Sequence, residues 1–165
     1  MNQSYKPSKF FILAGAVALT AGVATLSNMK SAPTEMDQSI LPVRDAVVNV
    51  VGNGKHVLSV FENPECTYCE QLAPELASLK NVTLRRYVLP GNSESSRRTA
   101  IATVCAAQPG GAAEDCAAGA TIIDRNLALA RGLGIPSTPT LIFADGRVYI
   151  GALKIGQLEA RVYKQ

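Results

Sequence analysis

The sequence has no tryptophan and only one histidine, His56, among its 165 residues. A zinc site with histidine ligands, or a cysteine–histidine nucleophilic pair, would therefore depend on His56 alone. His56 lies well before the nearest cysteine, at the predicted start of a strand, and we interpret it as a structural residue. We accordingly expect no metal and no other cofactor.

Net charge is also missing from most of the chain. The formal charge of +3 is accounted for by Lys6, Lys9 and Lys30, so acidic and basic residues balance over the remainder. We therefore interpret the paired arginines at 85–86 and 97–98 as solvated surface groups rather than as a basic patch. Because nucleic-acid binding requires many phosphate contacts from basic side chains, we predict no nucleic-acid partner.

One long apolar run, Phe10 to Leu26, contains no charged residue. Lys6 and Lys9 precede it and Lys30 follows, which is the arrangement of an export signal. Its length lies between that of a signal core and that of a spanning helix of about 20 residues. We therefore predict that residues 1–30 are either a cleaved signal peptide or an inner-membrane anchor, with the rest of the chain exported.

A chain of 165 residues has room for one ordinary domain. Residues 31–46 contain Pro33 and Pro42 among polar residues, and we predict a poorly ordered linker there. Residues 47–165 then form the domain.

Strand-like and helix-like segments alternate along that domain and predict an α/β fold. Apolar runs at 47–51 and 56–61 flank Gly52-Asn53-Gly54, which predicts a hairpin. The second run leads into a segment, 66–80, with leucines at helical spacing, and residues 81–89 alternate as a strand. These segments predict a strand–helix–strand unit.

The second half of the domain is expected to begin with a mostly helical insert interrupted by Pro109-Gly110-Gly111. A loop rich in glycine and proline follows, and Asp145-Gly146 predicts a hairpin turn before a last short helix. The predicted segments are helices at 93–107 and 112–130, the loop at 132–140, strands at 141–143 and 147–150, and a helix at 157–163.

Four cysteines in an exported chain suggest disulfides, but their spacings define two unlike pairs. The tight pair is Cys66-Thr67-Tyr68-Cys69, at the predicted start of a helix. A thiol at that position faces unpaired backbone N–H groups and the positive end of the helix dipole, both of which favour the thiolate. We predict that Cys66 is the nucleophile and that Cys69 resolves the mixed disulfide.

A plain structural disulfide, or half of a zinc site, is the alternative interpretation of this motif. A zinc site would need Cys105 and Cys116 as its second half, and their wide spacing does not form a zinc knuckle. A strand that leads into C-x-x-C at a helix start is instead typical of a redox site.

The region from about Lys55 to Tyr163 resembles the thioredoxin superfamily, in particular the catalytic domain of bacterial periplasmic disulfide isomerases of the DsbC and DsbG type. The resemblance rests on three segments and on Pro74, which is similar to the kink proline of thioredoxins. The segments are KHVLSVFENPECTYCEQL, LRRYVLPG and LGIPSTPTLIFADGRVYIGA. The resemblance implies a thioredoxin-like α/β fold with a helical insert, preceded by the N-terminal export segment.

The resemblance also implies particular site residues. The Thr138-Pro139 bond would be cis and would bring its loop against the C-x-x-C motif, where backbone groups can pair with an extended substrate peptide. Cys105 and Cys116 would form a structural disulfide worth roughly 3 kcal/mol, although a second redox pair stays open for them. The residues expected to contact substrate are Thr67, Tyr68, Thr138 and Pro139.

The function implied is reduction or isomerisation of disulfides in exported, cysteine-containing proteins in the periplasm, with a membrane thiol reductase as redox partner. A disulfide-forming oxidase stays open, as does a tethered peptide-binding assembly factor that kept the fold. A cytochrome-maturation thioredoxin is disfavoured, since such proteins carry tryptophan where Glu65 stands. Few residues separate the apolar run from the first strand, so we expect a monomer without the dimerisation domain of those isomerases.

Overall fold

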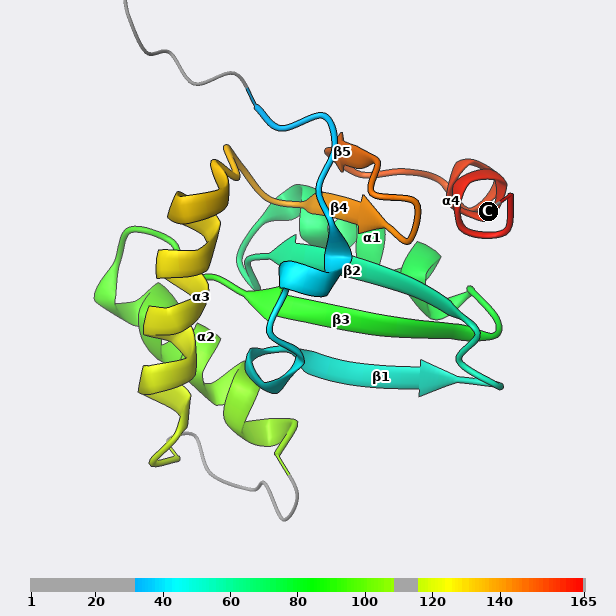
Figure 1. Cartoon of the computed structure of the whole chain (residues 1–165). Helices are drawn as coiled ribbons and strands as arrows, with labels where there is room; N and C mark the ends of the chain where they lie inside the picture. The colour runs from blue at the N-terminus through cyan, green and yellow to red at the C-terminus, as the bar shows by residue number, and fades with distance from the viewer. Residues whose placement is uncertain (1–31, 109–115, 165) are drawn as a thin grey trace, which may run out of the picture.

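The computed structural model describes residues 32–108 and 116–164. Within them, five strands form one mixed sheet in the order β1-β3-β2-β4-β5, and the helices lie on both faces and at one end of it (Figure 1). The elements are the 3-10 helices η1 (Gln38–Ile40) and η2 (Val43–Asp45), strands β1 (Val47–Val51), β2 (His56–Glu62), β3 (Val82–Val88), β4 (Thr140–Phe143) and β5 (Val148–Ile150), and helices α1 (Thr67–Ala77), α2 (Glu94–Ala106), α3 (Gly119–Leu133) and α4 (Ile155–Val162).

The predicted strand–helix–strand unit is confirmed, because β2 and β3 run parallel and α1 connects them. The predicted hairpin between β1 and β2 is wrong. Strand β3 lies between the two, antiparallel to β1 and parallel to β2. The Gly-Asn-Gly turn allows the chain to reverse direction, but it does not determine which strand pairs with β1. Since β1 leaves Val48 and Val50 exposed, it suits the edge of the sheet, whereas β3 is buried enough for the interior.

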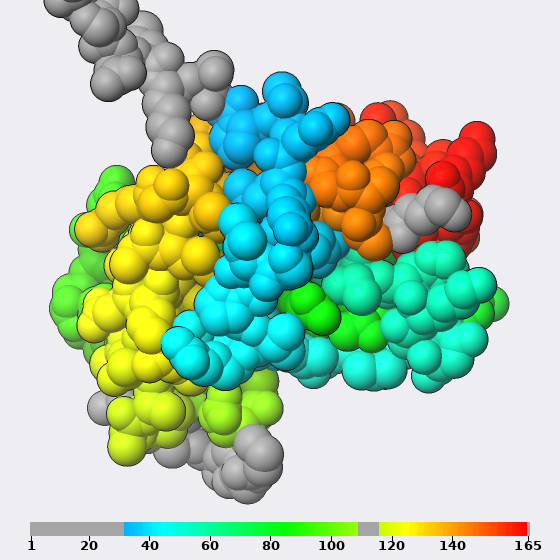
Figure 2. Space-filling model, viewed as in Figure 1, coloured from blue at the N-terminus to red at the C-terminus, as the bar shows by residue number. Residues whose placement is uncertain are grey.

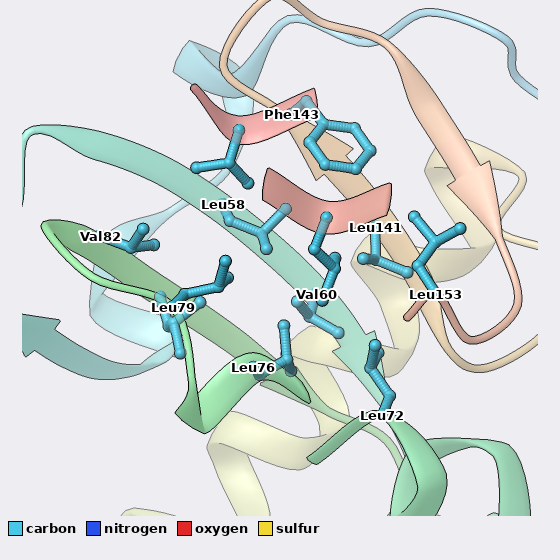
Figure 3. Close-up of a cluster of buried hydrophobic side chains, with 12 residues drawn as sticks. Leu58, Val60, Leu72, Leu76, Leu79, Val82, Leu141, Phe143 and Leu153 are labelled. Atoms are coloured by element: carbon cyan, nitrogen blue, oxygen red, sulfur yellow. The ribbon is translucent and has the colours of Figure 1, made fainter. Parts of the chain in front are cut away.

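One face of the sheet is covered by α1 and α4. Leu72 and Leu76 of α1 and Leu158 of α4 are buried against the alternate strand residues Leu58 and Val60 (Figure 3). Leucines four apart share one face of a helix, and residues two apart share one face of a strand. This packing holds the first turn of α1 at the end of β2, where the C-x-x-C motif lies.

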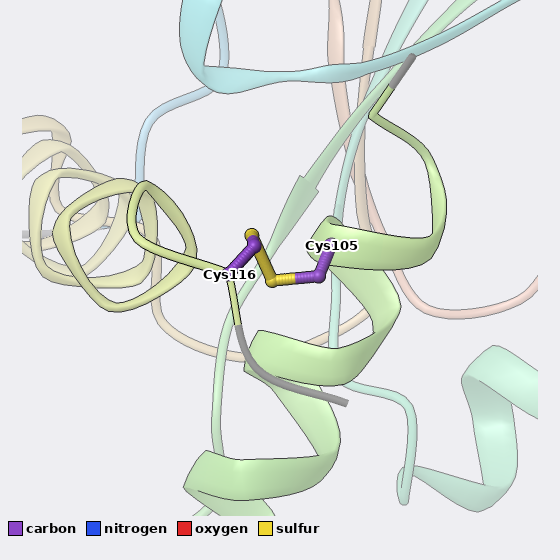
Figure 4. The surroundings of a disulfide bond; sticks show 2 residues. All are labelled: Cys105 and Cys116. Carbon is purple, nitrogen blue, oxygen red and sulfur yellow. A yellow bond between two sulfur atoms is a disulfide. The ribbon is translucent and has the colours of Figure 1, made fainter. Parts of the chain in front are cut away.

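The opposite face and one end of the sheet are covered by α3 and α2. Phe61 stacks on Tyr87 beneath α3, with ring centroids 5.0 Å apart. A disulfide between Cys105 and Cys116 joins the last turn of α2 to the residues just before α3 (Figure 4). The two helices of the insert are therefore linked covalently, and the Cα atoms of the two cysteines lie 5.6 Å apart.

The expectation of low order before the first strand is wrong for much of residues 32–46. This segment runs across the sheet between α3 and the β4–β5 hairpin (Figure 2). Met36 and Leu41 are buried, and the Gln38 side chain donates to the Ile142 carbonyl at 2.9 Å. The sequence pattern did not predict this packing, because the two buried apolar residues and Gln38 are isolated among polar residues and prolines.

Among the helices of the described residues, none has the length and apolar character needed to cross a bilayer. The predicted export segment, residues 1–30, lies outside that part of the chain.

Candidate active site

Cys66 lies at the N-terminal end of α1 as its N-cap residue, with extended backbone dihedrals. A tight turn places it there: the Cys66 N–H donates to the Asn63 carbonyl at 3.0 Å, and the Glu65 N–H donates to Asn63 Oδ1 at 2.9 Å. An N-cap side chain normally accepts hydrogen bonds from the N–H groups of the second and third helical residues. Cys66 holds the N-cap position, but its sulfur makes no regular capping hydrogen bond.

The environment of Cys66 favours its ionised form. Partial burial opposes ionisation, but hydrogen bonds from the Thr138 side chain and from the N–H groups of Cys69 and Tyr68 outweigh it, so the pKa of Cys66 lies below its usual value. The first N–H groups of a helix have no partner within the helix, so these two can stabilise negative charge on the sulfur. The flanking Glu65 and Glu70 do not reverse this balance.

Cys69 has the opposite environment. Burial raises the pKa of the Cys69 thiol to about 12, with a further increase from the neighbouring Cys66. The N–H of Asn63 donates to Cys69 Sγ at 3.5 Å and only partly offsets that effect. Both cysteines are free thiols in the structure. The environment thus favours the thiolate at Cys66 and the protonated thiol at Cys69.

The loop before β4 faces Cys66. Its Thr138–Pro139 peptide bond is cis, and the Cys66 thiol donates to the Thr138 carbonyl at 3.3 Å. A groove of about 460 Å³ lies beside this contact, between the first turn of α1 and the segment after β5. Tyr68 lines the groove with 62% of its surface exposed, and exposed Ile150 lies further along it.

Most of the predicted site residues are therefore brought together. Cys66, Cys69, Tyr68 and Thr138 meet where α1 begins, with Pro139 buried beneath. Thr67 belongs to the same turn but is exposed and does not line the groove. The Cys105–Cys116 pair lies apart, between α2 and α3. The ring of His56 packs edge-on against Tyr163 with centroids 5.1 Å apart, which fits the structural interpretation.

Sequence reasoning missed two features of the site. Asn63 organises the turn that presents Cys66, and its position between a strand and Pro64 was the available signal. An ion pair between Glu62 and Arg86 also lines a second cavity, whose wall includes Cys69. The sequence carries no signal for that pair, because it depends on how β2 and β3 align.

A strand that enters C-x-x-C at a helix start, opposed by a cis-proline loop on a mixed sheet, defines the class of thioredoxin-fold dithiol proteins. The family profile described as Thioredoxin-like domain matches residues 43–165. The chain belongs to this family, and the predicted thioredoxin-like α/β fold and superfamily resemblance are confirmed.

Two proteins of known name are similar to this chain in sequence. The chain is 35% identical over 136 residues to the "Probable thiol:disulfide interchange protein DsbC" of Bordetella avium, a match covering 75% of this chain and 48% of that protein. It is 34% identical over 131 residues to the protein of the same name in Bordetella pertussis, covering 74% and 47%. The chain thus spans about half the length of the curated relatives it matches.

A solved structure supports the same assignment. The crystal structure of a disulfide interchange protein from Neisseria gonorrhoeae superposes with a TM-score of 0.62 at 25% identity. The match covers 75% of this chain and 97% of that one. The resemblance to DsbC-type proteins, predicted from the motifs, therefore extends to the sequence of most of the chain, and the structure resembles that of a disulfide interchange protein.

Proposed function

We propose that this protein is a periplasmic thiol–disulfide oxidoreductase that reduces or isomerises disulfides of exported proteins through a mixed disulfide on Cys66. The observation that carries the proposal is the contrast within the C-x-x-C motif. Hydrogen bonds at the start of α1 favour the Cys66 thiolate, whereas burial keeps Cys69 protonated. The thiolate is the attacking species in disulfide exchange, so the first step is assigned to Cys66.

The chemistry proceeds in two exchanges. The Cys66 thiolate attacks a substrate disulfide, forms a Cys66–substrate disulfide and releases the other substrate sulfur as a thiolate. The mixed disulfide then reacts with a second substrate thiolate, which completes isomerisation, or with Cys69, which completes reduction and leaves a Cys66–Cys69 disulfide. A membrane thiol reductase would return that disulfide to the dithiol.

Substrate binding is assigned to the groove beside the cis-proline loop. Backbone groups of Thr138 would pair with an extended substrate segment in the manner of an added strand. Exposed Tyr68 and Ile150 offer apolar contacts that do not require one particular sequence. This suits an enzyme acting on many exported proteins.

Two observations support an oxidising compartment. The Cys105–Cys116 disulfide is of the kind that persists outside the cytosol. The apolar run at residues 10–26 has the pattern of an export signal. Whether that segment is cleaved or kept as a tether does not alter the chemistry at Cys66.

The proposal is tested by insulin reduction with three variants. We expect Cys66→Ser to lower the rate to that of the uncatalysed reaction, and Cys69→Ser to accumulate mixed disulfides with substrate. The control replaces both Cys105 and Cys116 by alanine and should retain activity within a few-fold once folding is verified. Activity that survives Cys66→Ser but is lost in the control would contradict the assignment.

A further inference from the structure

The two edges of the sheet are protected to different degrees. At β5, the Val148 N–H donates to the Thr34 carbonyl at 3.0 Å, and Glu35 forms a bridge with Arg147, so the segment before η1 covers part of that edge. At β1, no strand of the described part of the chain pairs with the side that faces away from β3 (Figure 1). An edge strand with free N–H and C=O groups is a template for another strand.

Strand β1 also lacks the features that normally block such pairing. Its residues, Val47–Val51, include no charged residue and no proline, and their register with β3 is unbroken. On one face, Val48 and Val50 leave 41% and 62% of their surface exposed. On the other face, Asn49 and Val51 line the second cavity, of about 490 Å³, beside α1. Because natural edge strands commonly carry lysine, proline or a bulge, we expect this edge to be covered in the working protein.

The sequence of β1 identifies what covers it. Val-Val-Asn-Val-Val is the same in both directions about Asn49. Two copies of such a strand can pair antiparallel about a two-fold axis through Asn49, and Val48 then faces the partner's Val50 while Val47 faces the partner's Val51. Each pair joins two β-branched side chains on one face of the sheet, which is a favourable cross-strand combination. The strand is therefore complementary to a second copy of itself.

The backbone and the flanking residues fit the same register. Alternate residues of an antiparallel edge strand direct their N–H and C=O groups outward. Both alternate sets in β1, 47/49/51 and 48/50, are symmetric about Asn49, so the free groups of one copy meet those of the other. Just beyond the strand, Ala46 faces the partner's Gly52, and these small residues allow close approach. No like charges oppose each other across residues 43–55 in this register.

We propose that two copies of this chain pair through β1, antiparallel about Asn49, and join their sheets into one. The proposal does not depend on the reaction assigned to Cys66. It replaces the monomer expected from the sequence, because the interface lies within the thioredoxin-like domain and requires no separate dimerisation domain. The substrate groove borders β5, at the opposite edge of the sheet, so both grooves stay open in the dimer. A contact made by one short strand falls below the roughly 1,200 Å² of a standard stable interface, so we expect reversible association.

A cysteine on the two-fold axis tests the register in the full chain. In a background of Cys66→Ser and Cys69→Ser, Asn49→Cys places two thiols directly opposite each other. A short bis-maleimide should then join the two copies into a covalent dimer. Asn53→Cys, at an exposed position just beyond the same strand, is the matched control. Its two thiols lie at opposite ends of the paired strands, so we expect about ten-fold less product.

Charge exchange at the same position separates specific pairing from general association. Asn49→Lys alone, or Asn49→Glu alone, places like charges opposite each other. We expect each variant to sediment as a monomer, whereas the dimer fraction of the wild-type protein rises with concentration. An equal mixture of the two variants should recover the dimer, which also shows that both have folded.

Four results would overturn the proposal. The first is a wild-type protein that sediments as a monomer over roughly a hundred-fold range of concentration reaching the micromolar affinities of weak complexes. The second is equal cross-linking of Asn49→Cys and Asn53→Cys, and the third is a mixture of the charged variants that does not associate. The fourth is binding of an unfolded polypeptide that is lost in Asn49→Lys, with no dimer at any concentration; it would assign the edge to an extended client in place of a second copy.

Discussion

Cys66 is both the N-cap residue of α1 and the proposed nucleophile. Its sulfur makes no regular capping hydrogen bond, yet the N–H groups of Tyr68 and Cys69 at the start of α1 lower the pKa of Cys66. Thr138, 72 residues away in sequence, acts in two ways: its carbonyl accepts from the Cys66 thiol, and its side chain lowers the pKa of Cys66. The reactive state of Cys66 therefore depends on both sides of the site.

The Thr138 contribution can be measured directly. We expect Thr138→Val to raise the pKa of Cys66, because the variant keeps the backbone carbonyl but loses the side-chain hydrogen bond to sulfur. The pKa is read from thiolate absorbance at 240 nm, and alkylation at pH 7 should slow a few-fold. Ser137→Ala, an exposed neighbour in the same loop, is the matched control. An unchanged Cys66 titration in Thr138→Val would contradict the assigned contact.

Sequence reasoning was strongest at this scale where a motif is contiguous. C-x-x-C after a strand identifies Cys66 and Cys69, and the short Thr138-Pro139 segment could be matched to a family pattern. Glu62 and Arg86 could not be paired in this way. Their contact spans 24 positions and depends on strand register, which periodicity does not specify.

Among the elements, periodicity predicted the helices and strands well but not how β1 pairs. It also missed η1 and η2, where isolated anchors rather than a repeating pattern hold the chain. Gln38 is the clearest example: its side chain donates to the carbonyls of Val57 and Ile142, at 3.3 and 2.9 Å, and accepts from the Ser59 hydroxyl at 2.8 Å. One amide thus clamps residues 32–46 to both β2 and β4.

Removing this clamp should destabilise the fold. We expect Gln38→Ala to lower the free energy of unfolding by about 1–3 kcal/mol, because the hydroxyl of fully buried Ser59 loses its partner. Urea unfolding provides the measurement. The double variant with Ser59→Ala should lose less than the sum of the single changes, and Ser39→Ala on the same turn should change little. A Gln38→Ala protein as stable as wild type would refute the clamp.

For the molecule as a whole, the fold class followed from the alternation of elements together with the family motifs, whereas buried polar groups could not be foreseen. Tyr87 illustrates this. Its hydroxyl is buried and has no hydrogen-bond partner among the described residues, and burial raises its pKa to about 12. The nearby Asp45 contributes to the same increase, and Arg85 opposes it.

This raised pKa makes stability sensitive to alkali. Folded Tyr87 holds its proton up to about pH 12, whereas an unfolded tyrosine releases it near pH 10. The contribution is thus complete below pH 10 and is lost between pH 10 and 12. It amounts to up to about 3 kcal/mol.

The Tyr87→Phe variant tests this linkage. In the oxidised protein, where Cys69 does not titrate, we expect the variant to flatten the fall in unfolding free energy between pH 10 and 12. At pH 7 it should be within about 1 kcal/mol of wild type, since no hydrogen bond is lost. Urea unfolding at pH 8, 10 and 11.5 supplies the comparison. Parallel stability curves for both proteins would show that Tyr87 titrates normally.

The most direct test of the central claim is competitive alkylation of the reduced protein with limiting iodoacetamide, mapped by mass spectrometry from pH 5 to 9. Cys66 is expected to react first, with a midpoint below that of an ordinary cysteine, because helix N–H groups and Thr138 hold its thiolate. Cys69 is expected to stay unmodified over this range because burial keeps it protonated. Faster labelling of Cys69, or equal labelling of both with the midpoint of a free thiol, would contradict the account.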